Sequence, residues 1–184
     1  ITSPFSFVSS ATSILFSHAK PVFADIDPKT FNISPDEIRK KITPKTKAIM
    51  PVHIFGQCAD MPAIREIANE HNLKIIEDAC QAHGAEIQEK RAGSFGDSAA
   101  FSVYPTKNMT TGEGGAVTTS TPEVAERLRL LRQHGLAGPY QYRMLGYNSR
   151  MTDIEAAIGL MQLGKLEGFN TARRMNAETL TEFL

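Results

Sequence analysis

Segments with strand character alternate along this chain with segments of helical periodicity, and this alternation limits the possible folds more than any other feature. The strand candidates are short apolar runs, at 46–53, 73–78, 98–103 and 115–119. The helical candidates begin at polar residues that suit helix N-termini, Ser34, Asp60, Thr121 and Thr152. Strands separated by helices are typical of a mostly parallel sheet with helices on both faces. We therefore expect a three-layer α/β fold.

Composition excludes several classes of function. Lys and Arg total 20 and Asp and Glu total 20, so the formal net charge is zero, which argues against nucleic acid or an anionic membrane as a partner. No apolar run approaches the roughly 18 residues that span a bilayer. Two cysteines, Cys58 and Cys80, are too few for a disulfide framework or a zinc site. These features favour a cytoplasmic protein.

The first candidate site residue is Asp78, at the end of the strand predicted over 73–78. Ligands of parallel α/β sheets bind beyond the carboxyl ends of the strands. A carboxylate at the tip of a buried strand is costly unless it has a partner. Asp78 could cap the following turn, or it could face a cation in the ligand crevice.

The second candidate is Lys107, which follows the strand predicted over 98–103 and a turn at Pro105. A lone lysine is usually a solvated surface residue. Lys107, however, lies between Ser102, a hydroxyl residue at the strand end, and the glycine-rich segment 110–115. This placement suits an amine that is held in a site and activated there by desolvation.

Common catalytic and nucleotide-binding motifs are absent. The chain has no phosphate-binding loop of the G-x-x-x-x-G-K-[ST] type, no G-x-G-x-x-G after a strand, no H-E-x-x-H and no G-x-S-x-G. The five histidines lack metal-ligand spacing, only His83 lies near the candidate site, and Cys80 has no evident base. The long stretch 133–149 is expected on the surface or in an interface.

Six segments, in order along nearly the whole chain, resemble the DegT/DnrJ/EryC1/StrS family of pyridoxal-phosphate-dependent sugar aminotransferases. They lie at 3–8, 20–27, 46–57, 77–85, 102–115 and 145–153. The resemblance implies the large domain of a fold-type-I transferase that uses pyridoxal 5′-phosphate. It also implies that residues 1–184 are part of a longer protein. A phosphate-binding turn is expected upstream of Ile1, and a smaller C-terminal domain after Leu184.

The resemblance assigns chemical roles to the two candidates above. Lys107 matches the lysine that forms the Schiff base with the cofactor and then acts as general base and acid. Asp78 matches the partner of the pyridine nitrogen, where an anion keeps that nitrogen protonated. The protonated ring is the electron sink of the reaction.

Four further residues match cofactor-binding positions of the family. Ser102 matches a hydroxyl donor to the phosphate, and Gln81 matches a side chain near the ring hydroxyl. Phe7 matches an aromatic residue that stacks on the ring, with core packing as the alternative. Asn148 matches a residue that reaches the phosphate of a neighbouring subunit's cofactor, with an ordinary turn residue as the alternative. A shared site of this kind implies a homodimer.

The resemblance implies transfer of an amino group, usually from glutamate, to a nucleotide-linked keto-sugar in amino-sugar or polysaccharide biosynthesis. One rival is a sugar dehydratase with the same cofactor, but such relatives replace the lysine with histidine, so Lys107 favours transamination. A second rival is a non-enzymatic regulator or remnant of the family. The sugar, the nucleotide and the aminated carbon stay open at this stage.

Overall fold

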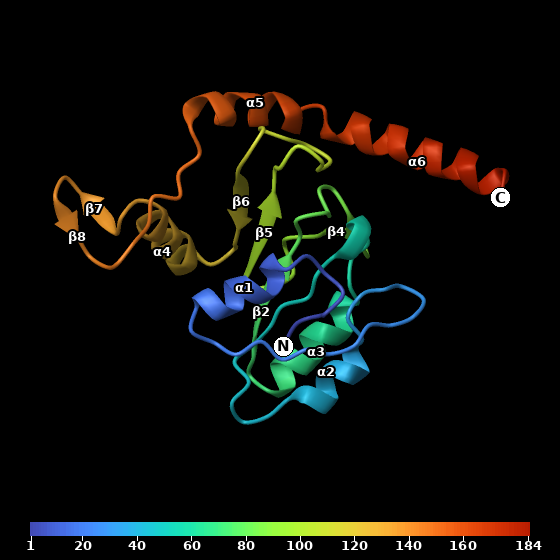
Figure 1. Ribbon diagram of the computed structural model, residues 1–184, viewed down its shortest axis with the longest axis horizontal. Coiled ribbons are helices and arrows are strands. Elements are labelled where there is room, and N and C mark those ends of the chain that lie inside the picture. The colour runs from blue at the N-terminus through green and yellow to red at the C-terminus, as the bar shows by residue number, and fades with distance from the viewer.

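The computed structural model describes all residues 1–184, and a four-stranded sheet lies at its centre (Figure 1). The strands, in spatial order, are β1 (Ala48–Ile49), β2 (Lys74–Asp78), β5 (Ser98–Ser102) and β6 (Gly115–Thr118). The first three run parallel and β6 is antiparallel to β5. Parallel bridges from Thr2 to Met50 and to Phe23 extend the row beyond β1. The prediction of a mostly parallel sheet is confirmed.

The helices are α1 (Ser9–Phe16), α2 (Pro35–Lys41), α3 (Met61–Glu70), α4 (Pro122–Arg132), α5 (Asp153–Leu163) and α6 (Leu166–Glu182), with a 3-10 turn, η1 (Ile54–Gly56). Four of the six α-helices, α2 to α5, begin directly after the residues at which the sequence predicts them, whereas the starts of α1 and α6 were not predicted. The side chains of Ser34, Asp60 and Thr152 each accept a hydrogen bond from a backbone N–H in the first turn. In a capping box, the third residue of the helix also accepts from the backbone N–H of the capping residue. Only Thr152 has a complete one, since its N–H donates to the Glu155 carboxylate. Side-chain caps therefore set three of the helix starts.

The core lies between one face of the sheet and the helices α2 and α3. Ile38, Ile64 and Ile67 from the helices pack with Ile49 and Ile75 from the strands, and all five are buried. Burying each such side chain contributes about 1.5–3 kcal/mol. This side of the sheet is therefore the stable platform on which the strand ends are held.

The opposite face of the sheet is covered less completely. The helix α1 lies over the carboxyl end of β2 (Figure 1), and its Ser10 bonds Asp78. Farther along the same face, Ile76 is 40% exposed and Val117 is 52% exposed. The carboxyl edge of the sheet and this face thus remain open to a ligand or to further chain.

Two hairpins stand outside the sheet: β3 (Glu86–Ile87) with β4 (Lys90–Arg91), and β7 (Leu136–Gly138) with β8 (Gln141–Tyr142). The second lies within 133–149 and is exposed, as that segment was expected to be, with Tyr140 at 91%. The long helix α6 leaves the body of the molecule (Figure 1) and buries only Leu166 and Asn170. None of the helices combines the length and the apolar character that crossing a membrane requires.

Candidate active site

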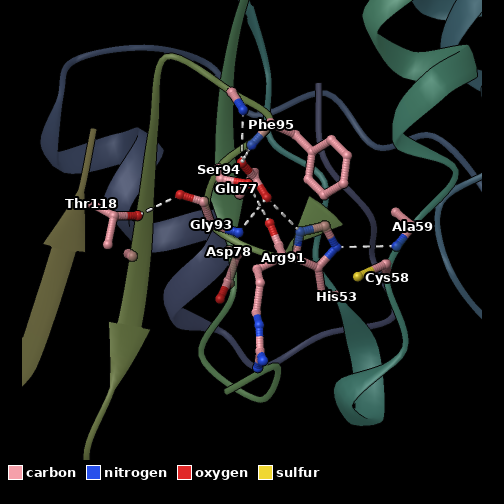
Figure 2. A network of polar contacts seen from close by, with 12 residues as sticks. His53, Cys58, Ala59, Glu77, Asp78, Arg91, Gly93, Ser94, Phe95 and Thr118 are labelled. Carbon is pink, nitrogen blue, oxygen red and sulfur yellow. Dashed lines mark hydrogen bonds and ion pairs between the residues drawn. The ribbon is translucent and has the colours of Figure 1, made fainter. Parts of the chain in front are cut away.

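Two neighbouring carboxylates at the end of β2 point in opposite directions. Successive side chains of a strand project to opposite faces of the sheet. Figure 2 shows Glu77 directed toward His53 and Asp78 directed away from it. Glu77 is fully buried, whereas Asp78 is half-buried. The strand therefore presents one carboxylate to the core and the other to the open face.

Glu77 has a complete set of hydrogen-bond donors. Its carboxylate accepts three backbone N–H bonds of 2.7 Å from the 93–96 segment and lies 2.9 Å from His53 Nε2 (Figure 2). His53 Nδ1 accepts from Ala59 N at 3.1 Å, so Nε2 carries the proton and donates to Glu77. Burial raises the pKa of Glu77, but the bonds from His53 and the backbone outweigh it and hold the pKa below 4.5. Glu77 and His53 therefore join the end of β2 to the 93–96 segment and to the segment around Ala59.

Asp78 has fewer donors. Ser10 Oγ donates to Asp78 Oδ2 at 2.7 Å, and Ser6 Oγ lies 2.7 Å from Ser10 Oγ. Cys80 N donates to Asp78 Oδ1 at 3.3 Å, so the turn-capping alternative is also realised. A carboxylate offers roughly four lone-pair positions, and these bonds use two. Asp78 can therefore cap its turn and still accept from a cationic N–H.

Gln81 is oriented by the turn η1. Phe55 N donates to Gln81 Oε1 at 2.7 Å. Gly56 has a φ of +83°, and a Cβ there would lie 3.0 Å from the Gln81 carbonyl oxygen, so the turn requires glycine to approach this closely. Since the amide oxygen is engaged, the NH₂ group of Gln81 is the part that can donate to a ligand.

Ser102 is the last residue of the next parallel strand, β5, and Lys107 follows that strand. The register pairs Asp78 with Ala100, so β2 and β5 end at the same edge. Ser102 Oγ accepts from Tyr104 N at 3.3 Å, and Lys107 N donates to Tyr104 O at 3.0 Å, which closes a turn. The Lys107 side chain is half-buried and no hydrogen bond or ion pair involves its amine, in contrast to its neighbour Asn108.

Charge effects connect Lys107 with the residues after β2. Burial raises the pKa of Cys80 to about 12, the charge of Asp78 adds to this, and the positive charge of Lys107 opposes it. Burial also lowers the pKa of His83, the Ser102 backbone opposes this, and Lys107 adds to it. Cys80 is thus a neutral thiol and no nucleophile at neutral pH. Lys107 lies near enough to act on both groups.

The last two predicted residues, Phe7 and Asn148, make no hydrogen bond to Asp78, Gln81, Ser102 or Lys107. Phe7 is 74% exposed, so the core-packing alternative is wrong, and its carbonyl accepts from Ser10 N at 3.1 Å just before α1. Asn148 is exposed, bridges to Gln133 and accepts from Arg150 Nε at 3.0 Å. No hydrogen bond joins Asn148 to the other predicted residues of its own chain.

Three partners of this region were not foreseen from the sequence. Ser10 holds Asp78, His53 holds Glu77, and Asn170 of α6 bonds His83 and Asn108. Only Ser10 had a signal, since it belongs to a serine-rich run between residues 3 and 13. His53 lies in a strand pattern and Asn170 in a helix pattern, and neither pattern indicates which distant residue a polar side chain will bond.

Comparison with known proteins agrees with this geometry. The chain is 46% identical to a pleiotropic regulatory protein of Geobacillus stearothermophilus over 100% of its length and 50% of that protein. It is 47% identical to the GDP-perosamine synthase of Caulobacter vibrioides, covering 91% of this chain and 46% of that protein. The chain therefore spans about half the length of the curated relatives it matches.

A solved structure of NtdA from Bacillus subtilis with bound cofactor PMP superposes with a TM-score of 0.82 at 39% identity, covering 90% of this chain and 38% of that one. The model of the DegT/DnrJ/EryC1/StrS aminotransferase family matches residues 1–184. With the α/β sheet and the pair of strand ends described above, these matches establish that the chain belongs to this aminotransferase family.

Proposed function

We propose that residues 1–184 form most of the cofactor-binding domain of an aminotransferase that uses pyridoxal 5′-phosphate. In this proposal the complete enzyme moves an amino group from glutamate to a nucleotide-linked keto-sugar. The observation that carries the proposal is the pair of parallel strand ends, where Asp78 keeps free acceptor positions and Lys107 has an unpaired amine. Chain beyond these residues completes the phosphate cup and the substrate cleft.

The side chains at this edge fit the chemical groups of the cofactor. Asp78 offers an anion for a protonated ring nitrogen, and Gln81 offers an amide NH₂ for the ring hydroxyl. Ser102 offers a hydroxyl for the phosphate. Lys107 supplies the amine that links to the aldehyde carbon. When bound, pyridoxal phosphate supplies an electron sink that stabilises negative charge on the substrate carbon.

Asp78 and Lys107 have separate tasks in this proposal. The Asp78 carboxylate, held by Ser10, keeps a proton on the ring nitrogen because a nearby anion favours the cationic form. Lys107 Nζ would be the base that takes the proton from the substrate carbon bearing the nitrogen. The resulting ammonium would then be the acid that gives this proton back. Since burial and Asp78 hold Cys80 as a neutral thiol, that residue takes no part.

Phe7 and Asn148 complete the proposed site, one from beside Asp78 and the other from a second copy of the chain. Phe7 is exposed beside the α1 turn that holds Asp78, where an aromatic ring can stack on a planar ligand. Asn148 lies apart from the site of its own chain, which supports contact with the cofactor phosphate of a second copy. We therefore infer a homodimer with shared sites. Cys58 and Cys80 are unpaired, which fits the cytoplasmic location that we propose.

The test is the absorbance spectrum of the complete protein, loaded with pyridoxal phosphate, before and after addition of glutamate. An aminotransferase converts its cofactor to the amine form when glutamate is added. The absorption band of the bound cofactor at the edge of the visible range then moves to shorter wavelength. A band that glutamate leaves unchanged would contradict the glutamate-dependent reaction and favour the dehydratase. A protein that takes up no cofactor would contradict the enzyme proposal and favour the regulator.

A further inference from the structure

The helix α6 is exposed along nearly all of its length, yet Asn170 within it is only 7% exposed. The side chain of this residue makes two hydrogen bonds. Its Nδ2 donates to the His83 carbonyl at 2.8 Å, and its Oδ1 accepts from Asn108 Nδ2 at 3.0 Å. Asn108 directly follows Lys107. One buried amide thus joins the turn after β2 to the turn that carries the lysine.

The protein chain is fitted closely around this amide. Gly84 has a φ of +78°, and a Cβ at this position would lie 2.6 Å from Asn170 Nδ2. Any other residue at position 84 would push the amide away. The base of α6 is also braced, since Arg91 pairs with Glu167 at 2.7 Å and donates to the Gly84 carbonyl at 3.3 Å. The bonds of Asn170 are therefore part of a packed junction and not a chance surface contact.

We propose that Asn170 is a positioning residue for Lys107. It acts through Asn108 and fixes the lysine turn against the turn that bears Gln81 and His83. A second brace comes from α5, where Gln162 Oε1 accepts from Thr110 N at 3.4 Å. We call the Asn170 side chain, with its bonds to Asn108 and His83, the clamp. Its role in catalysis rests on the proposed function, whereas its role in holding the two turns together does not.

The clamp matters because the amine of lysine sits on a flexible four-carbon stem. The amine occupies the reactive position more often when the backbone that carries its stem is fixed. A displacement of about 1 Å at a reacting group can cost on the order of 10²-fold in rate. Loss of the clamp should therefore lower kcat and leave KM nearly unchanged, because Asn170 does not touch the substrate.

The experiment compares Asn170→Ala and Asn170→Asp with Asn176→Ala in the complete protein. Asn176 lies on the same helix and is exposed, so it is a matched control. Asn170→Asp keeps an acceptor for Asn108 but places an anion against the His83 carbonyl. In cofactor-free protein, amide hydrogen exchange over 105–112 should accelerate about tenfold or more in both Asn170 variants. In loaded protein kcat should fall roughly 10- to 100-fold. The control should match the wild type in both measurements.

Asn108→Ala supplies a second variant that cuts only the lysine side of the clamp, in case the Asn170 variants fold poorly. It should reproduce the local exchange effect and add little to Asn170→Ala, because the two residues act through one bond. Unchanged exchange over 105–112, a uniform rise across the chain, or faster local exchange with normal kcat would each overturn the proposal. If the wild type binds no cofactor, the proposed function fails, and exchange alone still decides whether Asn170 holds the turn.

Discussion

Glu77 and Asp78 are adjacent in sequence and identical in charge, but their surroundings differ completely. Glu77 accepts from three backbone N–H groups and from His53, and it has no exposed surface. Asp78 accepts from one hydroxyl and one long backbone N–H, and it is half-buried at the open edge. A carboxylate with all its donors inside the protein serves the fold, whereas one with positions to spare can serve a ligand.

The comparison also separates stability from activity. Removing an acceptor oxygen or the charge at Glu77 leaves buried N–H groups without partners, which costs folding free energy. Neutralising Asp78 is expected to leave the fold intact and to remove the anion that the proposed cofactor needs. The predictions below test each side of this division, beginning with the largest expected effect.

Lys107→Ala should have the largest effect, and the effect should be on activity alone. The amine is the proposed covalent and proton-transfer group, so turnover should fall by at least about 10³-fold. The free energy of unfolding should stay within about 0.5 kcal/mol, because the side chain makes no hydrogen bond. Turnover and denaturant unfolding measure the two quantities, with Lys20→Ala at an exposed lysine as control. Substantial turnover in Lys107→Ala would remove the lysine from its role.

Glu77→Gln should lower the stability of the fold. The amide NH₂ would face backbone N–H donors in the 93–96 segment, and the bond to His53 would weaken. The free energy of unfolding should drop by about 2–4 kcal/mol. Urea unfolding of the cofactor-free protein measures this drop. The exposed Glu66→Gln on α3 is the control and should change stability by less than about 0.5 kcal/mol. An equally small effect at Glu77 would refute its structural role.

Gln81→Ala refines the comparison, because Gln81 makes a structural hydrogen bond and is also proposed to bind the cofactor. It would lose the bond from Phe55 N and the proposed bond to the ring hydroxyl. Cofactor affinity should weaken about tenfold, or about 1.4 kcal/mol. Equilibrium titration with pyridoxal phosphate gives the value. The control is Gln57→Ala, an exposed glutamine at the end of η1. Unaltered affinity would place Gln81 outside the site.

The smallest effect concerns pH. His83 is buried, and burial lowers its pKa from 6.5 by more than the Ser102 backbone raises it. Below pH 6.5 the unfolded chain binds a proton that folded His83 resists, so stability is complete above this pH and declines as pH falls. His83→Phe should flatten the decline just below pH 6.5, where the slope from one group is at most about 1.4 kcal/mol per pH unit. Thermal unfolding between pH 5 and 7, with His18→Asn as control, tests the slope. An unchanged slope would show that His83 does not titrate this way.

The strand ends and most of the helix starts could be predicted because their signals are local. Three of the predicted N-terminal residues cap helices, and Asp78 and Lys107 follow the strands that the apolar runs predict. The missed contacts are long-range. Ser10 bonds Asp78 across 68 residues, and Asn170 bonds His83 across 87. No periodicity in a sequence records which distant side chain completes a hydrogen-bond set.

The strand prediction at 46–53 shows the same limit. Only Ala48–Ile49 forms ladder pairs, and the chain then continues through single bridges into a turn. The apolar pattern predicts a longer strand, but Pro51 has no N–H to donate to a ladder, so regular pairing stops before it. The antiparallel direction of β6 also follows from topology, because no helix lies between it and β5.

Asp78→Asn tests the central division most directly. The substitution removes the charge and keeps the shape. Both contacts can survive, because the amide oxygen can accept from Cys80 N while the amide NH₂ donates to Ser10 Oγ. The predicted result is an unfolding free energy within about 0.5 kcal/mol of wild type, retained cofactor, and turnover reduced by at least about 10²-fold. Near-normal turnover, or a loss of stability as large as that of Glu77→Gln, would contradict the separation of the two carboxylates.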